Sequence, residues 1–103
     1  MTEYHKLVRD RIPEIIRASG RDCEVRVLGD AEYAAKLDEK LREELDEYAA
    51  SGSVEELADL VEVVHAILAF RGVTAGDFEA LRVQKHGARG GFVERLLLER
   101  VSD

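Results

Sequence analysis

The chain is poor in the residues that mark secreted, disulfide-stabilised or loop-rich proteins. It contains one cysteine, Cys23, and one proline, Pro13, among 103 residues. A single cysteine cannot form an internal disulfide, and without a CxxC partner it is a weak metal signal. We therefore expect a cytoplasmic protein, and the scarcity of proline favours helix along almost the whole chain.

Positive charge is also scarce, and long apolar runs are missing. Fifteen Lys and Arg residues stand against 22 Asp and Glu residues, which gives a formal net charge of -7. This balance argues against a nucleic-acid polymer or an anionic membrane surface as a partner. No apolar run approaches the ~20 residues needed to span a bilayer, and the N-terminal residues lack the apolar core of a signal peptide. We expect a soluble protein with no membrane partner.

The amount of apolar material is enough for one domain. Hydrophobic residues make up 46% of the chain and charged residues 36%. A chain of this length can build one thin core but not two, so we treat residues 1–103 as a single domain. Association with further copies would help to stabilise such a core.

Two long helices have the clearest sequence signals. Apolar residues three or four apart predict a helix from Asp30 to about Ala50, with Asp30 as its N-cap. Residues 51–53 end it, and Ser53 with Glu56 has the spacing of a capping box for a second helix over about residues 54–70. The two helices should form a tight antiparallel hairpin. The second is apolar on two sides, which is typical of a central or interface helix.

Shorter elements flank this hairpin. Asp10 to Ala18 reads as a short helix capped by Asp10, and Thr74 caps another that runs to about His86. Alternation over residues 23–28 predicts a half-buried strand, and residues 92–98 suit either a strand or a last helical turn. As a strand, that last segment would pair with residues 25–28 or 4–8. The expected fold is mainly α, with a helical-hairpin core and a short terminal β element.

Acidic residues lie where the hairpin brings its two helices together. At about 100° per residue, Glu44 lies at the border of the apolar stripe, Glu47 shares its side, and Glu43 points away. On the second helix, Glu56 and Asp59 continue an apolar stripe, which is a costly place for unpaired charge.

Glu44, Glu47, Glu56 and Asp59 can therefore converge, and four close carboxylates need cations among them. Oxygen ligands of this kind suit Mg²⁺ or Mn²⁺. The alternative is that these acids are solvated, complement a helix N-terminus or pair with surface cations. Spacing alone leaves both interpretations open.

The pattern resembles a known family. Glu44-Leu-Asp-Glu47 followed by Glu56-Leu-Ala-Asp59 is similar to the ExxE…ExxD signature of the all-α nucleoside triphosphate pyrophosphohydrolases, the MazG-like superfamily. The segments KLVRDRIPE at residues 6–14 and RGGF at residues 89–92 resemble its phosphoribosyl-ATP pyrophosphohydrolase-like branch. The spacer over residues 48–55 is shorter than in many members of the superfamily.

The resemblance implies a chemistry and an assembly. Glu44, Glu47, Glu56 and Asp59 would be the catalytic and Mg²⁺-binding set, and a nucleotide would be split between its α and β phosphates into a monophosphate and pyrophosphate. Of the four, Glu47 is our choice for the group that acts on the attacking water. The resemblance also implies a homodimer or homotetramer with pockets near the interface.

Positive side chains should hold the substrate phosphates opposite the acids. The candidates lie near the two ends of the chain, where solvated surface charge is the alternative interpretation: Lys6, Arg9, Arg11, Lys85, Arg89 and Arg95.

Three functions remain open at this stage. The first is a Mg²⁺-dependent nucleoside triphosphate pyrophosphohydrolase of house-cleaning type. The second is hydrolysis of phosphoribosyl-ATP in histidine biosynthesis, which the same acids could perform on a bulkier substrate. The third is a nonenzymatic helical module whose acidic face meets a basic partner.

Overall fold

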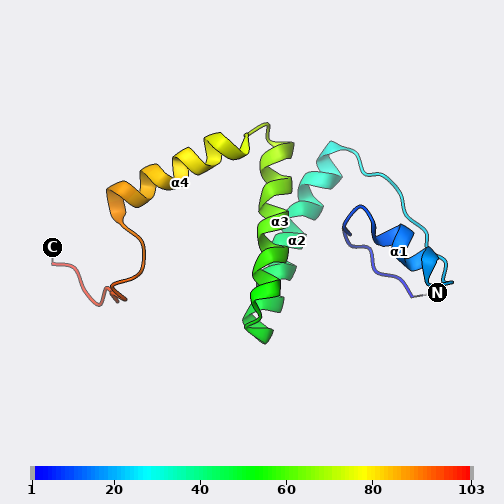
Figure 1. Cartoon of the computed structure of the whole chain (residues 1–103), viewed down its shortest axis with the longest axis horizontal. Helices are drawn as coiled ribbons and strands as arrows, with labels where there is room; N and C mark the ends of the chain where they lie inside the picture. The colour runs from blue at the N-terminus through cyan, green and yellow to red at the C-terminus, as the bar shows by residue number, and fades with distance from the viewer. Residues whose placement is uncertain (1, 103) are drawn as a thin grey trace.

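The computed structural model describes residues 2–102, and over that range the regular structure is entirely helical. Figure 1 shows its elements in chain order. Their bounds are Ile12–Ala18 for α1, Asp30–Ser51 for α2, Val54–Phe70 for α3 and Ala75–Arg89 for α4. The mainly α fold is therefore confirmed.

The α2/α3 hairpin is the centre of the structure. The two helices run antiparallel and side by side (Figure 1), as predicted. Gly52 ends α2 in the left-handed region at φ 66°, where its N–H donates to the Tyr48 carbonyl. Glycine adopts this conformation without the steric cost that a Cβ imposes, so the polypeptide chain can reverse its direction directly after α2.

The helix caps differ in part from those predicted. Gly29, not Asp30, is the N-cap of α2, because its carbonyl already accepts the Tyr33 N–H at 2.9 Å while its backbone is extended. Ser53 caps α3 as expected, but its hydroxyl accepts from the Glu55 N–H, two residues on. The α1 helix begins at Ile12 with Arg11 as its N-cap rather than Asp10, since residues 9–12 form a turn closed by the Ile12 N–H and the Arg9 carbonyl.

The core is small and lies along the α2/α3 seam. Leu37 from α2 and Val63 from α3 are its buried apolar residues within the described range. Tyr33 and Phe70 extend it with an edge-to-face ring contact, the ring centres being 5.3 Å apart. This seam holds the two helices in register and so fixes which of their polar residues face one another.

The α4 helix points away from the hairpin (Figure 1). Thr74 caps it through a bond from the Asp77 N–H, as predicted. The helix continues past the predicted end near His86, because Gly87 costs only about 1 kcal/mol inside a helix, and it ends at Gly90, where φ is 79°. None of its residues is buried.

The predicted β element is wrong for the described residues. Residues 4–8, 23–28 and 92–98 are neither helical nor paired as strands. A strand needs a partner backbone, and Figure 1 shows the last segment at the opposite end of the molecule from the other two. Val27 and Phe92, on two of these segments, are 98% and 97% exposed.

The single chain is elongated. Its radius of gyration is 18.2 Å and its extents are 60 × 31 × 26 Å, whereas a compact domain of about 100 residues has a radius near ~13 Å. None of the helices within residues 2–102 combines the length and the hydrophobicity needed to cross a membrane.

Candidate functional site

Three acids meet across the hairpin seam. Glu44 near the end of α2, and Glu56 and Asp59 at the start of α3, each offer an oxygen that lies within 4.8 Å of the other two. The antiparallel arrangement causes this, because the late turns of α2 lie beside the early turns of α3. We call these three residues the acid cluster. The predicted convergence of these residues is confirmed.

Glu47 belongs to a second group that shares Glu44. Its partners are Glu43 and Glu44, again with oxygens within 4.8 Å of one another. The four predicted acids therefore do not form one set, and Glu44 links two overlapping groups. Glu43, predicted to point away from the apolar stripe, lies on the side of α2 where Lys6 of the N-terminal segment contacts it.

Glu44 is the most unusual acid of the site. The residue is only 6% exposed, and its Oε2 has no hydrogen-bond partner. Burial, together with hydrogen bonding and repulsion from Glu47, raises its pKa above the ordinary value against the opposing effect of Lys40. A buried carboxylate oxygen without a partner is costly, and a cation beside the acid cluster would satisfy it.

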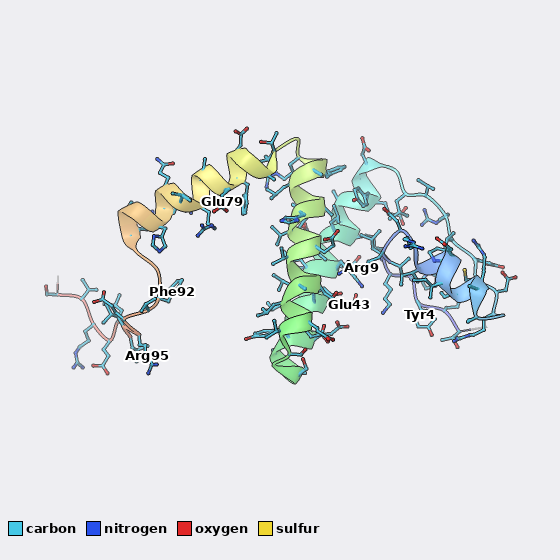
Figure 2. The ribbon with its side chains drawn as sticks, in the orientation of Figure 1. Tyr4, Arg9, Glu43, Glu79, Phe92 and Arg95 are labelled. Atoms are coloured by element: carbon cyan, nitrogen blue, oxygen red, sulfur yellow. The ribbon has the colours of Figure 1, made fainter. Side chains whose placement is uncertain are left out.

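Two cations from the N-terminal segment reach the acids. Arg9 donates to Asp59 at 2.6 Å, and Lys6 donates to Glu43 at 3.2 Å. Figure 2 shows Arg9 and Glu43 beside the hairpin. Burial favours a higher pKa for Glu43, but Lys6 and Lys40 together hold it below the ordinary value. Lys6 and Arg9 are thus the two predicted cations that contact acids of the hairpin.

The other predicted phosphate-binding residues lie elsewhere. Arg11 pairs with Glu14 at 3.3 Å at the start of α1. Lys85 and Arg89 are exposed on α4, and Figure 2 shows Arg95 at the far end of the molecule from Arg9 and Glu43. One copy of the chain therefore does not bring these three C-terminal cations to its own acids.

The sequence analysis missed Lys36 and Lys40. The Lys40 side chain is only 16% exposed, with its Nζ 3.3 Å from Glu44 and 3.5 Å from Glu43. Lys36 lies one helical turn earlier on the same face of α2. The i,i+4 spacing of Lys40 and Glu44 was the available signal, since such pairs are neighbours on a helix surface.

Over part of its length the chain is similar to a protein of unassigned function. Over 46 residues the chain is 61% identical to an uncharacterized protein of Mycolicibacterium smegmatis, and this match covers 45% of the chain and 47% of that protein. The chain therefore matches about half the length of that relative. No family model and no solved structure matches the sequence.

Proposed function

We propose that this chain is a Mg²⁺-dependent nucleotide pyrophosphohydrolase of the MazG-like type. It would cleave a nucleoside triphosphate between its α and β phosphates and release a monophosphate and pyrophosphate. The observation that carries the proposal is the meeting of Glu44, Glu56 and Asp59 across the hairpin, with a buried Glu44 oxygen that lacks a partner. The order of the two acidic motifs adds support.

The donor atoms suit a hard divalent cation. Three carboxylates on two packed helices leave room for water and phosphate oxygens, which is how Mg²⁺ is usually held, and Mn²⁺ accepts the same ligands. When bound there, the cation would offset phosphate charge and activate a water. In this proposal Glu44, Glu56 and Asp59 hold it. Glu47, exposed beside Glu44, accepts the proton of the attacking water.

The N-terminal cations would hold the substrate. Arg9 and Lys6 are paired with acids in the free protein, at Asp59 and Glu43 respectively. A guanidinium binds two phosphate oxygens at once and an ammonium acts as a compact charge. On binding, these groups would exchange a carboxylate for a phosphate oxygen, which frees Asp59 for the cation.

We also propose that the functional unit is a homo-oligomer. Leu57 and Val61 on α3 are exposed, and so is a run of apolar side chains after α4. A second copy would cover part of this surface, and its α4 could bring Lys85, Arg89 and Arg95 to the acids of the first. The extended shape of the single chain supports this proposal.

The test is a panel of nucleoside triphosphates, and phosphoribosyl-ATP, incubated with and without Mg²⁺ and resolved by chromatography. Glu56→Gln should lower turnover by at least ~100-fold, because a ligand charge is lost. Glu55→Gln is the matched control: it neutralises the neighbouring exposed carboxylate, which lies outside the acid cluster, and should leave turnover unchanged.

The products decide between outcomes. Monophosphate and pyrophosphate from the parent chain, lost in Glu56→Gln, support the proposal. Diphosphate and phosphate would mean that a different bond is cleaved. Absence of turnover, with no Mg²⁺ binding by calorimetry, would contradict the proposal and favour an acidic interaction module.

A further inference from the structure

A second polar feature lies beside the acid cluster, between the N-terminal segment and α2. It is a pocket of about 300 Å³, lined by residues 4–7 and by Lys36, Glu39, Lys40 and Glu43. We call it the lysine pocket. Neither the acidic motifs nor the resemblance drew attention to Lys36 or Lys40.

The pocket gathers three ammonium groups. Lys6, Lys36 and Lys40 outnumber its two carboxylates, Glu39 and Glu43. Three lysines at one place are a local concentration of donors for an anion in a chain of net charge -7, although Lys40 also pairs with Glu44, outside the lining.

The ammonium groups are held in position. Lys36 donates to the His5 carbonyl at 3.0 Å and pairs with Glu39 at 3.1 Å, and Lys6 pairs with Glu43 at 3.2 Å. His5 adopts a left-handed φ of 49° at this point, a conformation that non-glycine residues keep only where the surroundings impose it. The N-terminal segment is thus bent against α2, and its backbone fixes one lysine.

Lys40 contacts both the pocket and the acid cluster. The same Nζ that lines the pocket lies 3.3 Å from Oε1 of the buried Glu44. A chain of phosphates with one end at the acid cluster would therefore have the lysines along its path. The lining carries one phenol ring, that of Tyr4, and the Lys6 ammonium lies over it, 5.8 Å from the ring centroid, so the lining suits phosphate better than a stacked base.

We infer that the lysine pocket binds the pyrophosphate end of a polyphosphate ligand, with Lys36, Lys40 and Lys6 as its phosphate contacts. This inference rests on the proposed function for the identity of the ligand, which is the β and γ phosphates of the substrate and then the released pyrophosphate. Glu39 and Glu43 orient the lysines in the free protein and yield them to phosphate oxygens on binding.

The experiment is calorimetric titration of the full chain with inorganic pyrophosphate, with and without Mg²⁺. Lys36→Gln and Lys6→Gln should each weaken binding roughly five- to tenfold, as expected for loss of one charge-assisted contact. Lys36→Arg keeps the charge and should retain most of the affinity.

Arg42→Gln is the matched control. It removes one positive charge from an exposed position of α2 that does not line the pocket, and it should bind pyrophosphate like the parent chain. Helicity by circular dichroism should be the same for all variants. If Lys36→Gln fails to fold, Lys6→Gln carries the test.

Failure of the inference and failure of the proposed function look different. Equal pyrophosphate affinity in Lys36→Gln, Lys6→Gln and Arg42→Gln, or no binding by the parent chain, would overturn the lysine pocket even where nucleotides are hydrolysed. Binding that weakens selectively in the lysine variants would uphold the pocket even if no nucleotide is turned over, in which case the proposed function alone fails.

Discussion

The two halves of the chain form helices equally well but use them differently. The α2/α3 hairpin packs apolar residues against one another, buries Glu44 and receives the N-terminal segment. The α4 helix and residues 90–102 bury none of their side chains, and Figure 1 shows them apart from the hairpin. Helix formation is a local property, whereas burial needs a second surface, and in one copy of the chain only the hairpin has one.

The exposed apolar residues make this difference physically significant. Five side chains after α4 are at least 79% exposed: Phe92, Val93, Leu96, Leu97 and Leu98. Apolar surface of this extent is usually covered by a partner. The comparison therefore predicts that the hairpin supplies stability within the chain and that the C-terminal region supplies association between chains.

The largest expected effect on stability is in the hairpin core. Leu37→Ala should lower the free energy of unfolding by about 2–4 kcal/mol, because it leaves a cavity at the α2/α3 seam. Chemical denaturation followed by circular dichroism measures this. Leu45→Ala, at an exposed position of the same helix, is the control and should change stability by less than ~1 kcal/mol. Equal effects would mean that the seam is not the core.

The next effect concerns association. Sedimentation at micromolar concentration should give a homodimer or homotetramer, and Leu97→Glu should shift it toward monomer because a charge is then buried in the contact. Val27→Glu, at an even more exposed position between α1 and α2, should leave the oligomer unchanged. A monomeric parent chain would contradict the assignment of association to the C-terminal region.

A smaller effect on stability is expected at Glu44, where substitution should favour the variant without metal and the parent chain with metal. Its pKa is raised mainly by burial, so the ionised form destabilises the fold at neutral pH. Without metal, Glu44→Gln should therefore raise the free energy of unfolding. With Mg²⁺ the parent chain should gain stability and the variant should not. A variant that gains as much from Mg²⁺ as the parent would remove Glu44 from the ligand set.

The smallest effect is expected on α4. A hydrogen bond from Arg82 and its charge lower the pKa of Glu79, so the pair favours the helix above the unfolded pKa and loses this contribution as pH falls through the lowered pKa. The pair is exposed and screened by salt. Glu79→Gln should therefore leave helicity, measured by circular dichroism at 222 nm, almost unchanged at pH 7. It should also abolish the slight loss of helicity that the parent chain shows at low pH. A large change at pH 7 would show that α4 is packed in solution.

Hydrophobic periodicity, together with helix-ending and helix-capping residues, was sufficient to predict the helical part of the fold. The apolar spacing in α2 and α3, together with Gly52 and Ser53, predicted both helices and their turn almost to the residue. The alternation of apolar and polar residues over 23–28 predicted a strand that the structure lacks. A two-residue period describes a face that could be buried in a sheet, but it does not supply the partner strand.

Helical spacing also predicted part of the site. The sequence predicted the convergence of Glu44, Glu56 and Asp59, because helical spacing and a short antiparallel turn fix their relative positions. The contacts of Lys6 and Arg9 could not be derived from spacing, since they depend on how an irregular segment lies against α2 and α3. Their positive charge made these two residues candidates for phosphate binding, but it made Lys85, Arg89 and Arg95 candidates equally.

The sequence by itself determined which residues are helical, where the hairpin turns and that Glu44, Glu56 and Asp59 face its seam, because those properties follow from interactions within a few residues. Only the tertiary structure decided that Glu44 is buried with an oxygen lacking a partner, that three lysines line one pocket, and that α4 stands apart. These depend on contacts between segments distant in the chain, whose energies no local pattern encodes.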